Sequence, residues 1–224
     1  MKPAALLDLL FPPHCAFCGR IGAGSVCPAC AAVLPRLAGQ RREGASFGVC
    51  AVPLRYEGMA REAILRLKFR GRRGAAAGLG ALLAQCAAEE LGGQFDTVTW
   101  APVSERRGRE RGYDQAYLLA RAAARLWDAK PARLLVKRRD NPPQSGLNAP
   151  ARRANVLGAY AVADAEAVRG ARVLLVDDVI TTGATLAECA RVLRDAGAQS
   201  VVCACVASAS TEATGKTAAN FCES

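Results

Sequence analysis

Histidine is nearly absent from this sequence, which has a single one, His14, among 224 residues. Enzymes most often use histidine as a general base, so no residue of the chain stands out for that role. The chain also lacks a run of about 18 apolar residues, the length that a membrane-spanning helix needs. Residues 4–11 are apolar but short, and Asp8 interrupts them, so we expect neither a signal peptide nor a membrane anchor.

Aromatic residues are scarce too, at 5% of the chain, whereas basic residues are in excess. Lysine and arginine number 30 against 20 acidic residues, and the formal charge of +10 favours phosphorylated metabolites, nucleic acid or acidic membranes as partners. The most basic stretch, residues 104–115, contains one aromatic residue, Tyr113, so it lacks the interleaved rings of a surface that stacks bases. With 51% hydrophobic residues, the chain can fold as one α/β domain with a small appendage.

Four of the ten cysteines form two C-x-x-C pairs, Cys15 with Cys18 and Cys27 with Cys30, with eight residues between the pairs. Each pair places two thiolates on a tight turn, and two such turns can close a tetrahedral zinc site. An iron–sulfur cluster and two redox pairs are the alternatives. Because four thiolates complete the zinc shell, we expect a structural site with His14 as a bystander. The other cysteines are scattered, which favours a protein of the reducing cytoplasm.

The most informative stretch is residues 173–185, in which a predicted strand runs into two acids, a turn of small residues and a helix. Val173 to Val176 are four consecutive β-favouring residues, as in a strand buried on both faces. Asp177 and Asp178 follow at its carboxyl end. The turn before the helix consists of Thr181, Thr182, Gly183, Ala184 and Thr185.

This order of elements suits a sugar phosphate. Small side chains let backbone N–H groups approach a phosphate, the helix N-terminus adds partial positive charge, and Gly183 permits a backbone conformation that a Cβ would hinder. Carboxylates just before the turn can accept hydrogen bonds from ribose hydroxyls or hold a hydrated Mg²⁺. An ordinary strand, polar turn and capped helix is the alternative, and it explains the complete string less well.

Two further segments place polar side chains where ligands bind in α/β proteins. A strand predicted over residues 95–103 runs into the basic loop 104–115, at the end of the sheet where ligands bind. Residues 138–155 are a long polar segment whose arginine, glutamine and asparagine residues suit a lid that closes on an anion. Residues 36–48 have the composition of a linker, so we expect a second domain to begin near Val49.

The string from Val173 to Thr185 resembles the phosphoribosyl-pyrophosphate (PRPP) motif of type I phosphoribosyltransferases. The resemblance implies that residues 181–185 hold the 5′-phosphate and that Asp177 and Asp178 face the ribose hydroxyls. With the cysteine pairs and Arg111–Gln115, the chain resembles ComF-type competence proteins, in which a zinc ribbon precedes such a domain. That family usually has asparagine where this chain has Asp114.

The expected fold is therefore α/β, with a mostly parallel twisted sheet flanked by helices as in type I phosphoribosyltransferases. We assign residues 1–40 to a zinc ribbon that includes a helical turn at its N-terminus. Residues 49–207 are assigned to the phosphoribosyltransferase-like domain, and residues 208–224 to a disordered tail.

The resemblance also implies a reaction, in which a nitrogen nucleophile displaces pyrophosphate from PRPP with the help of Mg²⁺. The expected catalytic residues are Asp177, Asp178, Arg111 and Arg152, and the expected pyrophosphate or lid residues are Lys68, Arg106, Arg107, Gln144 and Asn155. The alternative is a non-catalytic adaptor in DNA uptake for natural transformation, which senses PRPP or a nucleotide and binds single-stranded DNA and competence-machinery proteins.

Overall fold

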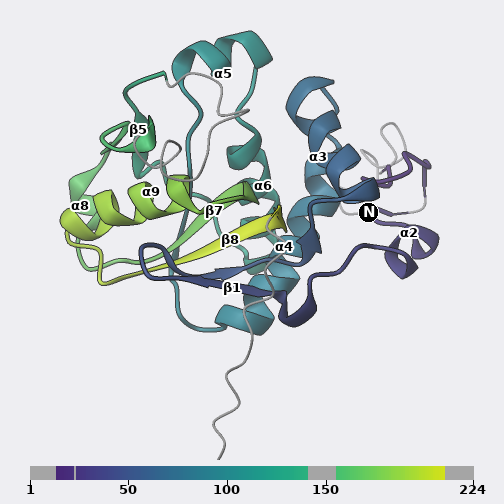
Figure 1. The fold of residues 1–224 in the computed structure, drawn as a ribbon, viewed down its shortest axis with the longest axis horizontal. Helices are drawn as coiled ribbons and strands as arrows, with labels where there is room; N and C mark the ends of the chain where they lie inside the picture. The colour runs from purple at the N-terminus through teal and green to yellow at the C-terminus, as the bar shows by residue number, and fades with distance from the viewer. Residues whose placement is uncertain (1–13, 23, 141–154, 210–224) are drawn as a thin grey trace, which may run out of the picture.

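A mostly parallel six-stranded sheet forms the centre of this computed structural model, which describes residues 14–22, 24–140 and 155–209 (Figure 1). The strands run in the order β1-β2-β8-β7-β4, and β3 pairs with the end of β8. Only β1 is antiparallel to its neighbour in this sheet. The α/β fold class expected from the sequence is therefore confirmed. The strand bounds are Arg41–Gly44 (β1), Gly48–Ala51 (β2), Leu54–Arg55 (β3), Thr97–Trp100 (β4), Arg172–Ile180 (β7) and Ser200–Ser208 (β8).

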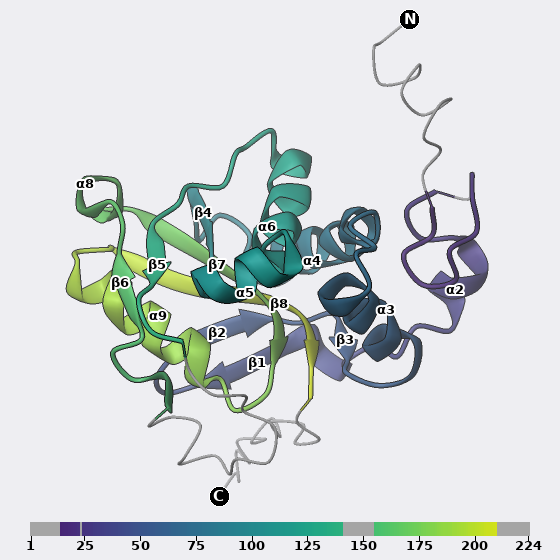
Figure 2. The ribbon, with the colours of Figure 1, turned by 90° about the horizontal axis from the view of Figure 1, so that it is seen from above.

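Alternating residues of the central strand divide the core into two halves. Leu174 and Val176 of β7 belong to the half that α3, α4 and α6 cover, whereas Val173 and Leu175 belong to the half that α9 covers (Figure 2). A strand buried on both faces needs an unbroken apolar run, which is why the sequence identified it. The helix bounds are Gly58–Phe69 (α3), Ala75–Leu91 (α4), Gln115–Ala124 (α6) and Ala184–Asp195 (α9).

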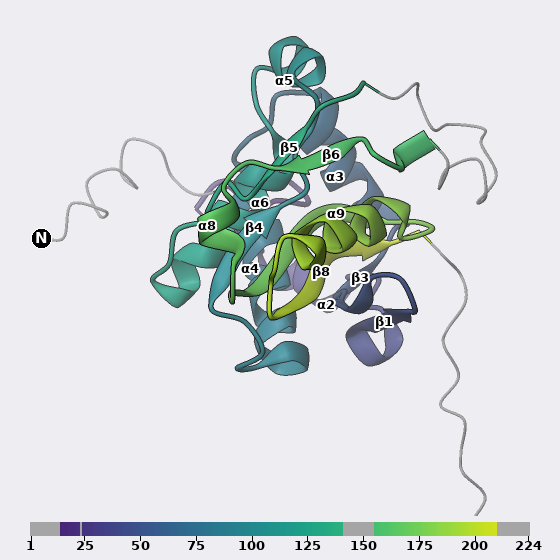
Figure 3. The ribbon, with the colours of Figure 1, turned by 90° about the vertical axis from the view of Figure 1, so that its left-hand side faces the viewer.

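A smaller antiparallel sheet of two strands lies over α9, as Figure 3 shows. It consists of β5 (Leu135–Lys137) and β6 (Tyr160–Val162), and we call it the hood. Leu135 and Tyr160 are buried in the same half of the core as α9, so the hood packs against that helix. Short helices outside the knuckle include α5 (Glu105–Arg111), η2 (Arg125–Trp127) and α8 (Ala165–Val168).

The cysteine-rich turns form a knuckle, residues 14–34, at one edge of the molecule beside α3 (Figure 1). The knuckle contains α2 (Pro28–Ala32), and η1 (Ala38–Gln40) follows it. Phe17 is buried in the same half of the core as α3 and α4. Contact with α4 is close, because a Cβ at Gly78 would lie 2.2 Å from the backbone oxygen of Ser25. The knuckle is therefore packed onto the sheet domain.

The structure differs from the sequence expectations in four segments. Residues 36–48, expected as a linker, contain β1, which pairs with β2 along its whole length. The basic segment expected as a loop forms α5, with the Ser104 hydroxyl accepting from the N–H of Arg107 as its cap. β7 continues four residues beyond Val176, because its pairing with β8 extends to Ile180. Residues 156–162 have the composition of one continuous strand, but only Tyr160–Val162 pairs with β5.

The structure also bears on the expectation of no membrane span. Within the described residues, we find no helix whose length and apolar character would let it cross a bilayer.

Candidate functional site

The acid pair lies inside β7 rather than after it. β4 pairs with β7 only as far as Val176, so the two acids continue the strand beyond its neighbour on that side. Successive side chains of a strand point to opposite faces, which sends Asp177 toward the α9 half of the core and Asp178 toward the α3 half. The two carboxyl groups therefore meet different surroundings.

Asp178 is paired with a lysine from α3. The Nζ atom of Lys68 lies 2.8 Å from Oδ1 of Asp178, and the two side chains are 21% and 6% exposed. Burial works to lower the pKa of Lys68, but the charge of Asp178 outweighs it and raises this pKa, so the lysine is a cation. The second oxygen of Asp178, Oδ2, is buried and has no hydrogen-bond partner among the described residues. A buried oxygen without a donor is rare in folded proteins, and it suits a ligand hydroxyl or a metal ion.

Asp177 faces the hood. Its Oδ1 accepts a 2.8 Å hydrogen bond from the backbone N–H of Asp178. Burial, and after it the charge of Asp178, raise the pKa of Asp177 to about 8. On the hood, burial and then the nearby Arg107 lower the pKa of Lys137, whose ammonium lies 5.1 Å from the centre of the Tyr160 ring. A carboxyl group that is protonated near neutral pH can donate as well as accept hydrogen bonds.

The turn between β7 and α9 encloses a small hollow. The hollow has a volume of about 20 Å³ and is lined by Asp177 and residues 179–186. That volume accepts roughly one water-sized group. α9 starts after Gly183, which has φ 74° and no side chain to cap the helix, and the Thr182 hydroxyl accepts from the N–H of Ala184 at 3.4 Å. The residues after Ala184 in this first turn line the hollow, and backbone N–H groups at helix N-termini are suited to binding anions.

Phe47 packs against the turn between β7 and α9, a contact that the sequence analysis did not predict. Its ring is buried and packs against Gly183, so that a Cβ on this glycine would lie 2.4 Å from the ring atom Cε1. Phe47 comes from the turn between β1 and β2, where its backbone oxygen accepts from the thiol of Cys203 at 3.7 Å. The local sequence carries no signal for this contact, because the segment around Phe47 has the composition of a linker.

The predicted arginines Arg106 and Arg111 contact other side chains of the protein. Arg106 pairs with Asp140 at 2.6 Å and with Glu110 at 2.9 Å. Arg111 donates to Oε1 of Gln115 at 2.9 Å, and its guanidinium lies 4.9 Å from the centre of the Phe69 ring. Phe69 follows Lys68, so Arg111 lies beside the turn of α3 that reaches Asp178.

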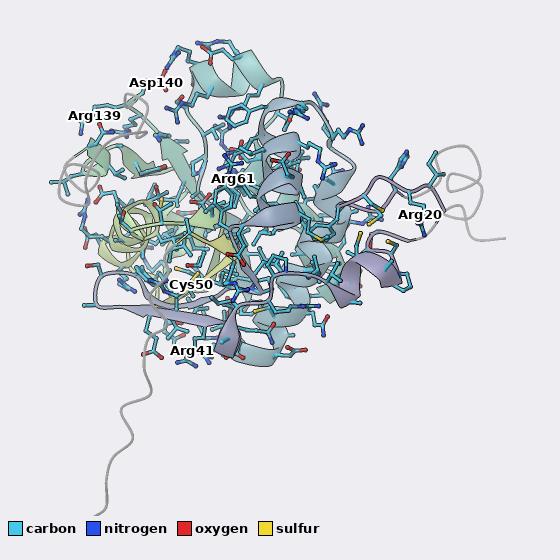
Figure 4. The ribbon with its side chains drawn as sticks, turned by 45° about the vertical axis from the view of Figure 1, so that its right-hand side comes forward. Arg20, Arg41, Cys50, Arg61, Arg139 and Asp140 are labelled. Carbon is cyan, nitrogen blue, oxygen red and sulfur yellow. The ribbon has the colours of Figure 1, made fainter. Side chains whose placement is uncertain are left out.

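The predicted lid residues are only partly described. Asn155 is half-buried where the chain re-enters the described part, and Gln144 and Arg152 lie outside it. Figure 4 shows Arg139 and Asp140, which precede the segment, on the side of the molecule away from Arg20 of the knuckle.

Asp114, where the resembling family usually has asparagine, has a structural role. Its Oδ2 accepts hydrogen bonds from Nε1 of Trp100 at 3.1 Å and from the backbone N–H of Val103 at 3.0 Å. Its Oδ1 accepts from the N–H of Tyr117 at 3.1 Å and so caps α6. The side chain accepts from all three donors, which ties the end of β4 to the start of α6.

The four predicted zinc ligands come together in the knuckle. The sulfurs of Cys15, Cys18, Cys27 and Cys30 all lie within 4.8 Å of one another, and those of Cys18 and Cys27 are 3.7 Å apart. A tetrahedral zinc site with Zn–S distances of about 2.3 Å has S···S edges of roughly 3.8 Å, so the arrangement fits zinc. His14 is exposed and outside the cluster.

The thiols differ in acidity. Burial works to raise the pKa of Cys15, but backbone N–H groups, led by that of Cys27, donate to its sulfur and lower the pKa to about 6. Burial and then hydrogen bonds with the other three cysteines raise the pKa of Cys30 to about 12. No cysteine among the described residues forms a disulfide, so the four sulfurs are available to a metal.

Comparison with known proteins finds a domain family for the knuckle and another for the sheet domain. Residues 6–62 match the double zinc ribbon domain, which together with the sulfur cluster supports a structural zinc site. Residues 109–220, half of the chain, match the phosphoribosyl transferase domain. This second match contains the acid pair and the turn before α9, whereas Lys68 lies between the two matched regions.

Several curated proteins are similar in sequence. Competence protein F of Haemophilus influenzae is 39% identical over 108 residues, which cover 47% of each chain. The DNA utilization protein YhgH of Salmonella typhimurium is 34% identical over 149 residues, 63% of each chain, so the similarity spans less than two thirds of either relative. YhgH of Escherichia coli strain K12 is 32% identical over 115 residues. The chain therefore belongs to the phosphoribosyl transferase domain family, as a ComF-type member that carries a double zinc ribbon.

Proposed function

We propose that the protein binds PRPP, or a related ribose 5-phosphate, where β7 leads into α9. Thr181, Thr182, Gly183, Ala184 and Thr185 hold the 5′-phosphate, and the acid pair binds the ribose hydroxyls. The observation that carries this proposal is the hollow at the N-terminus of α9, directly after two carboxyl groups on one continuous strand. An anion site and a hydroxyl-binding site next to each other match a phosphorylated sugar.

The acid pair also fits a magnesium ion. Mg²⁺ prefers one or two carboxylates together with the phosphates of a substrate. The buried Oδ2 of Asp178 lacks a hydrogen-bond partner among the described residues and is suited to this role. When bound with PRPP, Mg²⁺ supplies positive charge to the pyrophosphate group.

The reaction we propose is transfer of the phosphoribosyl group to a nitrogen nucleophile. The nitrogen lone pair forms a bond to C1 of the ribose, while the bond between C1 and the pyrophosphate oxygen breaks and its electrons leave with pyrophosphate. A proton on the nitrogen passes to water. Positive charge develops on the sugar, as in other glycosyl transfers, and cations stabilise the leaving group. Lys68, Arg106, Arg107, Arg111 and Arg152 serve as these cations, and Gln144 and Asn155 belong to the lid.

Pyrophosphate release tests this proposal. The protein is incubated with PRPP, Mg²⁺ and a panel of nitrogen nucleophiles that includes ammonia and nucleobases, and we expect release with at least one of them. Asp178→Asn should abolish it, whereas Glu166→Gln, an exposed acid of α8, should not. A thermal-shift titration with PRPP and Mg²⁺ reports binding separately from turnover, because a ligand of the folded state raises Tm. An unchanged Tm with PRPP would contradict the binding site. A rise in Tm without pyrophosphate release would indicate a protein that binds PRPP as a sensor and does not catalyse the transfer.

A second candidate function is that of an adaptor in DNA uptake, acting in the reducing cytoplasm with other competence proteins. Two observations favour it: the names of the relatives, and the charge of +10. We expect oligothymidine to bind, with log K falling against log salt by about 0.7 for each phosphate contacted. Binding that does not depend on salt, or no binding at low salt, would remove this function.

A further inference from the structure

The cation that holds Asp178 comes from a part of the chain outside both matched families. Of the ion pairs among the described residues, that between Lys68 and Asp178 is the one in which neither side chain is more than 21% exposed. Its 2.8 Å distance leaves no room for another group between Nζ and Oδ1. The acid proposed to bind a metal is therefore already compensated by the protein itself.

Two contacts hold the turn of α3 that leads to Lys68. Nη2 of Arg66 donates to the backbone oxygen of Phe17 in the knuckle at 2.6 Å. The hydroxyl of Tyr113 donates to the backbone oxygen of Leu67. Since the helix turn is held from two sides, a change at Asp178 requires movement of the lysine side chain, whose four-carbon stem is flexible.

A divalent cation that approaches Asp178 without a bound ligand would meet the ammonium group of Lys68. Two cations that share one buried carboxylate repel each other strongly, because little water is present to screen them. A ligand that brings a pyrophosphate group changes the balance, since its anionic oxygens offer the ammonium a new partner. Lysine is a common partner of phosphate groups.

We propose that Lys68 is the resident counter-ion of Asp178, and that it leaves this acid for the pyrophosphate group of the ligand. A divalent metal is then admitted to Asp178 only together with that ligand. The inference rests on the proposed function for the identity of the ligand. The part that concerns Lys68 and the metal alone can be tested without it.

Binding of Mn²⁺ alone, followed by electron paramagnetic resonance of the free ion, tests the role of Lys68. We expect wild type to bind Mn²⁺ weakly and Lys68→Met to bind it more tightly, by on the order of tenfold. Lys68→Arg, which keeps the cation, should behave as wild type, and so should Lys130→Met, which removes an exposed charge elsewhere. The same Mn²⁺ affinity in Lys68→Met and wild type would overturn the proposal.

Two further variants show where the additional Mn²⁺ binds and keep the test valid if Lys68→Met does not fold. Adding Asp178→Asn to Lys68→Met should abolish the gain; a gain that persists would place the metal elsewhere and overturn the proposal. Circular dichroism shows whether each variant is folded. If Lys68→Met does not fold, Lys68→Gln takes its place with the same expectation, because it also removes the charge.

The ligand arm uses wild type with Mn²⁺ and either PRPP or ribose 5-phosphate. We expect PRPP to recruit a bound Mn²⁺ and ribose 5-phosphate, which lacks pyrophosphate, to recruit none. Equal recruitment by both would overturn the exchange of Lys68 onto pyrophosphate. Failure of PRPP to bind in the thermal-shift assay would instead refute the proposed function, while the result with Mn²⁺ alone would still stand.

Discussion

At the scale of single residues, Gly183 satisfies two independent constraints. Its backbone has φ 74°, and a Cβ on it would lie 2.4 Å from the ring of Phe47. Gly93 shares only the first constraint, because it has the same φ of 74° but no atom within 4 Å of its Cβ position. The two glycines together separate the cost of backbone strain from the cost of steric overlap.

Gly183→Ala should lower the free energy of unfolding by more than Gly93→Ala does. Strain from a positive φ costs about 1 kcal/mol in both variants. Overlap with the buried ring of Phe47 adds about 1–3 kcal/mol in Gly183→Ala alone. Urea unfolding of both variants measures the difference, and equal losses would show that Phe47 does not support the turn.

Asp177 makes stability depend on pH. Burial and then the charge of Asp178 raise its pKa to about 8, whereas an unfolded aspartate titrates near 3.9. The folded state therefore binds this proton more tightly than the unfolded state does. The stability that this group contributes is complete below about pH 4 and is lost as the pH rises toward 8.

Asp177→Asn, which cannot ionise, should flatten this dependence. Between roughly pH 5 and 9, wild type should lose stability relative to the variant as the pH rises. Thermal unfolding at a series of pH values measures the difference in Tm. Profiles that run parallel over this range would mean that Asp177 is not protonated in the folded protein, while Glu166→Gln controls for the loss of an exposed acid.

At the scale of elements, the segment from β7 to α9 could be predicted because its signals are local. The apolar run, the acids, the small residues and the helix pattern follow one another in the sequence, so each can be recognised without its neighbours in space. The end of β7 could not be predicted, since it depends on pairing with β8, which carries the strand to Ile180. The contacts of Lys68 with Asp178 and of Phe47 with Gly183 could not be predicted either, because these partners are distant in sequence. The resemblance indicated Lys68 as a pyrophosphate or lid residue, but not its pairing with Asp178.

The hairpin of β1 and β2 shows how tertiary pairing overrides a local preference. Residues 41–44 have the composition of a linker, yet they pair with residues 48–51 and present Phe47 to the turn before α9. Phe47→Ala should destabilise the protein by about 3–5 kcal/mol, as expected for removal of a buried ring.

The Phe47 variant should also loosen the turn between β7 and α9. In hydrogen exchange, residues 181–186 should lose protection in Phe47→Ala more than α4 does, because the ring packs against Gly183. Phe47→Leu keeps part of the apolar contact and should have a smaller effect. Unchanged protection of residues 181–186 in Phe47→Ala would refute a supporting role for the hairpin.

At the scale of the whole molecule, α3 connects the knuckle to the acid pair. Arg66 contacts the backbone of Phe17, and two residues later Lys68 contacts Asp178. The cysteine turns, α3 and one face of the sheet also share a continuous half of the core. The knuckle and the acid pair of the proposed ligand site are thus attached to the same helix turn, so a change at one is expected to reach the other.

Arg66→Met tests this connection without touching either site. The variant removes a hydrogen bond from a charged donor to the buried Phe17, so it should cost about 1.5–3 kcal/mol and release zinc to a chelator faster than wild type. Arg61→Met, on the same helix, removes an exposed pair with Glu62 at 3.6 Å and should change neither property.

The rise in Tm on adding PRPP and Mg²⁺ shows whether the effect reaches Asp178. Because Arg66 helps to hold the helix turn that carries Lys68, we expect a smaller rise in Tm for Arg66→Met than for wild type. Wild type from which a chelator has removed zinc should show the same smaller rise. If Arg66→Met releases zinc faster while its PRPP shift stays that of wild type, the knuckle and the ligand site are energetically independent despite their common helix.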